Sequence, residues 1–117
     1  MREIDINTFA AQHAGGHTVI DVRELMEYVA GHVPGARLIP MGQITVHADE
    51  LPRDVPVYVI CASGNRSLAV ADFLANAGVD AWSVSGGTGA WARAGRSIVT
   101  GEQPNAADAA SPWKGIE

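Results

Sequence analysis

The chain of 117 residues lacks the features that would tie it to a membrane or to an oxidising compartment. It contains a single cysteine, Cys61, which excludes an internal disulfide and favours a reducing environment. No hydrophobic run is long enough to span a membrane, and the charged N-terminus, residues 1–6, lacks the apolar region of a signal peptide. We therefore expect a cytoplasmic protein that does not associate with a membrane.

Positive charge is also scarce. Eight lysines and arginines face 13 acidic residues, for a formal net charge of −5, and the basic residues form no cluster. Nucleic acid is therefore not expected as a partner. The apolar share of 47% and the charged share of 18% are ordinary for a globular chain of this length. One domain of this size can bury a core without disulfides or a structural metal.

The most informative stretch of the sequence is residues 55–78. Residues 57–60 form a short apolar run rich in β-branched side chains, which predicts a strand buried on both faces. From Ser67 the apolar residues follow helical spacing, and Gly78 stands where helices commonly end. The predicted apolar stripe of this helix consists of Val70, Phe73, Leu74 and Ala77.

A loop of small residues between this strand and helix begins with Cys61 and ends with Arg66. Unpaired N–H groups at a helix start, the helix dipole and the Arg66 charge would together stabilise a thiolate. Gly64 and Asn65 tolerate the positive φ values that such loops often need. The alternative is that Cys61 is an inert, buried side chain at the end of a strand. The glycine, the arginine and the helix start favour a reactive cysteine in an anion-binding loop.

The loop resembles the active-site loop of the rhodanese family, whose pattern is Cys-x-x-Gly-x-Arg followed by serine or threonine. The segment Cys61-Ala62-Ser63-Gly64-Asn65-Arg66-Ser67 matches every fixed position. The resemblance implies a sulfurtransferase: Cys61 would accept a sulfane sulfur from a donor such as thiosulfate or a persulfide. The Cys61 persulfide would then pass that sulfur to cyanide, a thiol or a protein cysteine. The substrate-binding loop would comprise Ala62, Ser63, Gly64, Asn65, Arg66 and Ser67.

Two other functions remain open on the same scaffold. Rhodanese-like domains also serve as non-catalytic binding or adaptor modules, but those often lose the cysteine that this chain keeps. Cysteine phosphatases place five residues between cysteine and arginine, whereas this chain has four, which disfavours a phosphatase or an oxyanion reductase. The resemblance implies no cofactor and no metal. Without a second cysteine the sulfur acceptor must come from outside, for example from a sulfur-relay protein.

Two further segments match structural signatures of the rhodanese family. The first runs from Asp21-Val22-Arg23 to residues 31–36, and the second contains Gly86-Gly87 before a tryptophan. Asp21 and Arg23 either brace the cysteine loop or form a salt bridge that holds the turn, and the sequence leaves both open. His32 is expected to be structural. The glycine pair would let its backbone approach the active-site loop closely.

Short strands alternating with helices predict an α/β fold with helices on both faces of a mainly parallel sheet. About five short strands are expected, at residues 2–6, 17–22, 37–39, 57–60 and 80–84. Helices are expected at residues 8–14, with Asn7 as cap, and at 24–30, with mixed helical character over 41–51. His13 and His17 are expected at the surface, because two glycines separate them.

The resemblance covers about residues 4–99, so we predict a rhodanese domain at residues 1–100. Residues 101–117 would form a C-terminal tail that is flexible or docks through Trp113 and Ile116.

Within the cysteine loop, Ala62 and Ser63 carry no charge, in a chain whose net charge is −5. We therefore expect weak affinity for the thiosulfate dianion and a preference for a persulfide donor.

Overall fold

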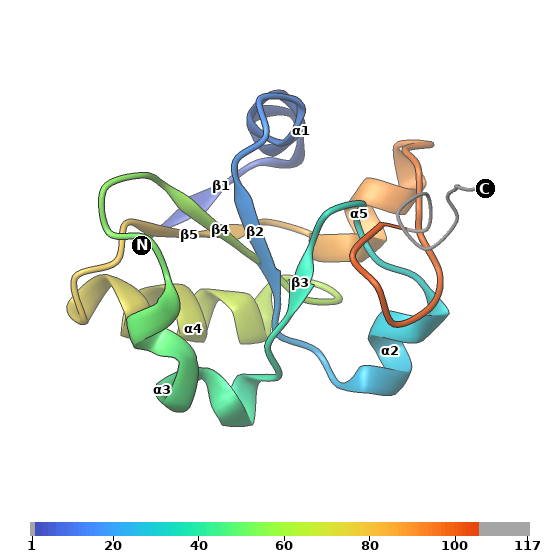
Figure 1. Ribbon diagram of the computed structural model, residues 1–117. Helices are drawn as coiled ribbons and strands as arrows, with labels where there is room; N and C mark the ends of the chain where they lie inside the picture. Colours follow the sequence, from blue (N-terminus) through green and yellow to red (C-terminus); the bar gives the residue numbers. More distant parts are fainter. Residues whose placement is uncertain (1, 106–117) are drawn as a thin grey trace.

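The computed structural model describes residues 2–105, which form a five-stranded sheet with helices on both faces (Figure 1). The strand order is β1-β5-β4-β2-β3, and neighbouring strands are parallel throughout this sheet. The strands are β1 (Glu3–Ile4), β2 (Thr18–Asp21), β3 (Arg37–Leu38), β4 (Val57–Ile60) and β5 (Ala81–Val84). The α/β fold and the parallel sheet predicted from the sequence are confirmed.

Strand β4 lies in the middle of the sheet, and all four of its residues are buried. Its continuous apolar sequence fits this position, because a central strand of a parallel sheet is covered on both faces. The strand pairs with β2 on one side and with β5 on the other. At the far edge, the two residues of β1 pair with β5, so the predicted edge strand at the N-terminus is confirmed.

Five helices accompany the sheet in the described part of the chain. They are α1 (Ile6–Ala14), α2 (Leu25–Ala30), α3 (Ile44–His47), α4 (Asn65–Asn76) and α5 (Gly87–Arg93). Short 3₁₀ turns at Met41–Gln43 and Ala48–Glu50 flank α3, which accounts for the mixed helical pattern of this region.

Two apolar clusters form the core, one on each face of the sheet. Residues of α3 and α4, such as Ile44 and Leu74, pack on one face against Val59. Phe9 of α1 and Trp91 of α5 pack on the other face. Figure 1 shows α3 and α4 together below the sheet and α1 on the opposite side. The connection through α1 crosses the sheet in the direction opposite to those through α3 and α4, which places it on the other face.

Two details of the helices differ from the sequence-based expectation. Asp5 rather than Asn7 caps α1, since its carboxylate accepts a hydrogen bond of 2.7 Å from the N–H of Thr8. Helix α4 begins at Asn65, two residues earlier than expected. Its buried face also turns away from the predicted stripe, because Phe73 is 43% exposed. That face consists of Ser67, Val70, Ala71 and Leu74.

The segment after α5 folds back onto the domain. His32 and Val99 exchange two backbone hydrogen bonds of 2.8 and 2.9 Å. Farther along, the N–H of Gly101 donates to Val29 O, and Pro104 O accepts from the N–H of Gly35. Residues 101–105 are therefore attached to the domain. The predicted docking residues of the tail, Trp113 and Ile116, lie outside the described residues.

Candidate active site

Cys61 follows the carboxyl end of β4, at the edge of the sheet where parallel α/β folds form their sites. The chain runs outward from β2 to β3 on one side of this point and from β4 to β5 on the other. Cys61 is 1% exposed and is the only cysteine of the chain. The fold thus places the candidate nucleophile between the two halves of the sheet.

The loop after Cys61 wraps around the sulfur. The N–H groups of Gly64 and Ser67 donate to Cys61 Sγ at 3.1 and 3.3 Å. Gly64 makes this turn possible because its φ is +111°, a left-handed backbone conformation that residues with a side chain rarely adopt. Helix α4 begins directly after it, so the sulfur lies at a helix N-terminus.

A chain of hydroxyl groups continues behind the sulfur. Cys61 Sγ donates to Ser67 Oγ at 3.3 Å, and Ser67 Oγ lies 2.8 Å from Ser83 Oγ. Both serines are fully buried. When the thiol ionises, the Ser67 hydroxyl can turn to donate to the sulfur while Ser83 donates to Ser67. The sequence analysis missed Ser83, although a serine within the otherwise apolar strand β5 was a usable signal.

These contacts favour the ionised form of the cysteine. Burial by itself raises the pKa of the Cys61 thiol, but hydrogen bonds from the Ser67 hydroxyl and from loop N–H groups outweigh it. The net effect holds the pKa of Cys61 below its ordinary value. The N–H groups that act in this way belong to Ser67, Gly64 and Ser63.

The second glycine-rich segment supports the loop from outside through its backbone. The N–H of Thr88 donates to Cys61 O at 2.8 Å, and that of Gly89 donates to Ala62 O at 3.1 Å. A Cβ atom on Gly87 would lie only 2.3 Å from Cys61 O. The close approach predicted for the glycine pair is therefore present, and only glycine fits at residue 87.

The sequence analysis expected the positive charge of Arg66 to stabilise a thiolate, and in the structure this charge is paired with a carboxylate. The guanidinium of Arg66 forms two hydrogen bonds of 2.9 Å with the carboxylate of Glu27, on α2. This bidentate contact lowers the pKa of Glu27 to about 2 and raises that of Arg66. The sequence analysis did not single out Glu27 as a site residue, because the two residues are far apart in the chain.

Asp21 and Arg23 form a buried salt bridge with Nη2–Oδ2 at 2.8 Å. Arg23 Nη2 also donates to Gly31 O at 2.7 Å, which ties the end of β2 to the turn after α2. Of the two roles left open by the sequence, the contacts match the salt bridge that holds the turn. Arg23 nevertheless lies on the wall of a pocket that also includes Ala62.

The other predicted loop residues lie at the surface: Ala62 is half-buried, and Ser63 and Asn65 are exposed. His32 is fully buried, its ring nitrogens 2.8 Å from Tyr28 O and 2.9 Å from Gln103 O, a structural arrangement. His13, expected at the surface, is instead half-buried and packs against Trp91.

Neither a metal site nor a membrane span is found in the part of the chain that the structure describes. Within residues 2–105, no three histidine, cysteine, aspartate or glutamate side chains lie close enough together to hold a metal ion. The helices of the same segment are all too short or too polar to cross a membrane.

These features place the chain among α/β proteins that have a parallel sheet and a cysteine loop at the carboxyl end of a central strand. Residues 7–94 match the rhodanese-like domain family. The chain belongs to this family. A protein named sulfurtransferase in Allochromatium vinosum is 33% identical over 105 residues, which cover 87% of this chain and 98% of that protein.

Solved structures agree with this assignment. A rhodanese-related protein from Thermoplasma volcanium has a TM-score of 0.78 and 33% identity, covering 86% of this chain and all of that one. A rhodanese-like domain protein from Staphylococcus aureus has a TM-score of 0.73 and 32% identity, covering 78% and 91%. A shorter match, 45% identical over 49 residues, covers 42% of this chain and 26% of a Bacillus subtilis protein whose name suggests a sulfur carrier. Together, the family and these relatives support a sulfurtransferase type of role in general.

Proposed function

We propose that this protein is a sulfurtransferase that works through a persulfide on Cys61. The observation that carries the proposal is the surroundings of the sulfur: two N–H groups and one hydroxyl contact Sγ within 3.3 Å. Such contacts stabilise a thiolate, which is the form of cysteine that attacks a sulfane sulfur. The names of the Allochromatium and Bacillus relatives agree with sulfur transfer.

The reaction has two steps. In the first, the Cys61 thiolate attacks the sulfane sulfur of a donor such as thiosulfate or a persulfide. A new S–S bond forms, the donor's bond to that sulfur breaks, and its electron pair leaves on the donor remnant. In the second, a thiophilic acceptor attacks the outer sulfur of the persulfide, and the thiolate of Cys61 is regenerated. The acceptor is cyanide, a small thiol or a protein cysteine, because the chain has no second cysteine.

The loop residues have distinct roles in this proposal. Gly64 and Ser67 hold the negative charge of the sulfur. Arg66, bound to Glu27, fixes the start of α4 and adds positive charge at the mouth of the site. The half-buried Ala62 and the exposed Ser63 and Asn65 border the approach of substrates. The proposed reaction requires no cofactor or metal, and the expected setting is the reducing cytoplasm.

Intact mass spectrometry tests the proposal directly. The protein is incubated with thiosulfate or with a small organic persulfide, and the mass of the whole chain is measured with and without a later addition of cyanide. We expect the gain of one sulfur atom, lost again with cyanide and absent in Cys61→Ser. A chain that gains no sulfur from any donor would instead favour the non-catalytic adaptor.

A further inference from the structure

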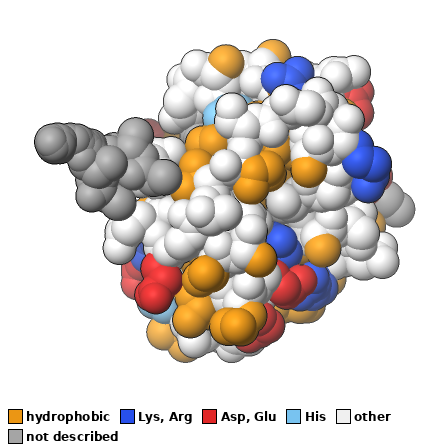
Figure 2. Space-filling model, turned by 90° about the vertical axis from the view of Figure 1, so that its right-hand side faces the viewer, with side chains coloured by type: hydrophobic (Ala, Val, Ile, Leu, Met, Phe, Trp, Pro, Cys, Tyr) orange, Lys and Arg blue, Asp and Glu red, His pale blue; other side chains and the backbone are white. Residues whose placement is uncertain are grey.

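A pocket adjoins the cysteine loop on the side of α2 and α5. It is an open depression with a volume of about 370 Å³, within the ~300–1,000 Å³ range of small-molecule sites, and its residues Ala30, Ala92 and Ile98 are exposed. Figure 2 faces this side of the molecule, where hydrophobic side chains reach the surface and acidic and basic side chains adjoin each other in the lower part. The pocket is lined by Arg23, Glu27, Ala30, Gly31, Ala62, Thr88, Gly89, Ala92 and Ile98.

The pocket is joined to the reacting cysteine through the backbone. Ala62, on its wall, directly follows Cys61. Two other wall residues, Thr88 and Gly89, donate their N–H groups to the carbonyls of Cys61 and Ala62, at 2.8 and 3.1 Å. A molecule bound in the pocket therefore lies against the loop that presents the sulfur.

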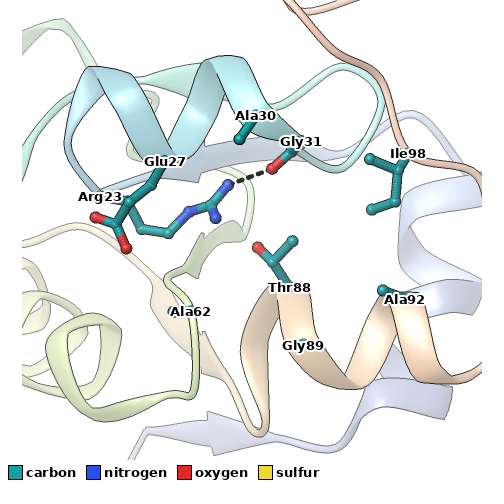
Figure 3. Close-up of a pocket in the computed structure, with 9 residues that line it drawn as sticks. All are labelled: Arg23, Glu27, Ala30, Gly31, Ala62, Thr88, Gly89, Ala92 and Ile98. Atoms are coloured by element: carbon teal, nitrogen blue, oxygen red, sulfur yellow. Dashed lines mark hydrogen bonds between the residues drawn. The ribbon is translucent and has the colours of Figure 1, made fainter.

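The lining of the pocket is mainly apolar. Figure 3 shows Ala30 of α2, Ala92 of α5 and Ile98 around one common space. The segment that carries Ile98 is held in place by the two hydrogen bonds between Val99 and His32. Gly31 leaves room for it, since a Cβ atom there would lie 2.9 Å from Ile98 Cγ2. A small inorganic anion has no apolar part that could contact these side chains.

One polar group in the pocket has no partner of its own. Thr88 is 8% exposed, and its Oγ1 is the buried side-chain oxygen for which residues 2–105 provide no hydrogen bond. In Figure 3 its side chain points from α5 toward the guanidinium of Arg23. Leaving a buried hydroxyl unpaired costs free energy, which a polar atom of a bound molecule would offset.

The charges around the pocket disfavour a dianion. Arg23 is 6% exposed, and its charge is balanced by Asp21. At the wall, Glu27 carries a full negative charge because its pKa is about 2, and it balances Arg66. A substrate with little charge and an apolar body meets no such penalty.

We propose, as an extension of the sulfurtransferase function above, that this pocket binds the organic group of a sulfane-sulfur donor. The donor is an organic persulfide, R–S–S⁻, with an apolar R group and a polar atom that reaches Thr88. The Cys61 thiolate attacks its outer sulfur, the S–S bond of the donor breaks, and the thiolate R–S⁻ leaves with the electron pair. Cys61 keeps the sulfur as a persulfide, and no oxidant or reductant is consumed.

Two stable probes isolate the contribution of the organic group. Benzenethiosulfonate and methanethiosulfonate carry the same charge and the same reacting sulfur. After this sulfur is transferred to Cys61, the remainder of each probe leaves as a sulfinate. The measured quantity is the second-order rate constant of sulfur addition to Cys61, followed by intact mass without any acceptor. We expect benzenethiosulfonate to react about tenfold faster than methanethiosulfonate in the wild-type protein, as burial of an aromatic ring predicts.

Variants that fill the pocket provide the decisive comparison. Ala92→Leu and Ala30→Leu narrow it from opposite walls, and each should reduce the ratio of the two rate constants at least fivefold. Ala11→Leu makes the same change on an exposed position of α1 and should keep the wild-type ratio. Thermal unfolding shows whether each variant is folded. If Ala92→Leu does not fold, Ala30→Leu provides the comparison.

The outcomes separate this proposal from the one it rests on. If no donor adds sulfur to Cys61, the sulfurtransferase function itself fails. If sulfur is added but both pocket variants keep the wild-type ratio, the function stands and the pocket does not bind the donor. Thr88→Val provides a further check: we expect the second-order rate constants of both probes to fall at least threefold, and unchanged rate constants would overturn the contact assigned to Thr88.

Discussion

Arg66 and Glu27 join the start of α4 to α2 through two parallel hydrogen bonds, each 2.9 Å long. Both side chains are about one-third exposed, so the pair lies at the surface of the site. In the proposed function, the guanidinium would both hold the loop in place and attract an anionic donor. Glu27 is thus expected to decide how strongly the site attracts negative charge.

Replacing Glu27 by glutamine should improve the use of thiosulfate. The change removes one negative charge beside the site and leaves the charge of Arg66 unbalanced. We expect KM for thiosulfate to fall about threefold at low salt, the size typical of one exposed charge, and the gain to shrink at high salt. Steady-state kinetics of thiocyanate formation measure this effect. Glu3→Gln, an exposed change on β1, is the matched control, and an equal gain there would contradict the local explanation.

The same pair should make stability depend on pH in the acid range. The pKa of Glu27 falls from its ordinary value of 4.5 to about 2 in the folded protein, so its contribution is fully present above pH 4.5. That contribution is lost as the pH falls toward 2. We expect Glu27→Gln to unfold at a lower temperature than wild type at pH 7, and the two curves to converge near pH 2. A gap that widens in acid would refute this account.

The hydroxyl of Ser67 should tune the acidity of the cysteine. Ser67→Ala removes one hydrogen-bond donor from the sulfur, so the pKa of Cys61 should rise. Alkylation by iodoacetamide, followed across pH, should show a midpoint at higher pH than in wild type. Sulfur transfer near pH 7 should slow by about threefold to tenfold. Ser97→Ala, an exposed change, should behave as wild type, and identical midpoints in all three proteins would exclude the role of the hydroxyl.

Gly87 should be among the least replaceable residues of the chain. An alanine Cβ would lie 2.3 Å from Cys61 O, so the loop or α5 would have to move. Gly16→Ala is the control, because Gly16 also has a positive φ of +82° but no atom within 4 Å of the added carbon. We expect Gly87→Ala to lose ~2 kcal/mol more than the control in urea unfolding. Equal losses would mean that the close backbone approach is not needed.

Aryl phosphates should not be hydrolysed by this protein. Four residues separate Cys61 from Arg66, and the guanidinium of Arg66 is bound to the carboxylate of Glu27. The loop therefore fits a single sulfur atom better than a tetrahedral phosphate. An assay with p-nitrophenyl phosphate tests this, with Cys61→Ser as the blank. Turnover that depends on Cys61 would restore the phosphatase alternative.

Local sequence patterns predicted the central strand, the loop and the helix after it, because each depends on neighbouring residues. Val57 to Ile60 form a strand, and the backbone around Gly64 brings N–H groups to the sulfur. The glycine pair was also recognised, since its value lies in the absence of a side chain.

Contacts between distant segments were not predictable in this way. The pairing of Arg66 with Glu27 was not foreseen, because Glu27 lies on another helix and nothing in the loop sequence encodes that contact. The buried face of α4 was misjudged at Phe73, since periodicity indicates a stripe but not its rotation toward the sheet. The serine in strand β5 could have been noticed, but its partner, the hydroxyl of Ser67, could not be read from the sequence.

The way Thr88 and Gly89 hold the cysteine loop has a consequence for how the site can be altered. Their hydrogen bonds go to the carbonyl oxygens of Cys61 and Ala62, so the fixing contacts run between main chains. The side chains of Ala62, Ser63 and Asn65 are left half-buried or exposed. In the proposed function, reactivity and substrate choice would therefore depend on separate atoms. A library of substitutions at these three positions could retarget the protein to new sulfur donors while the chemistry at Cys61 stays as it is.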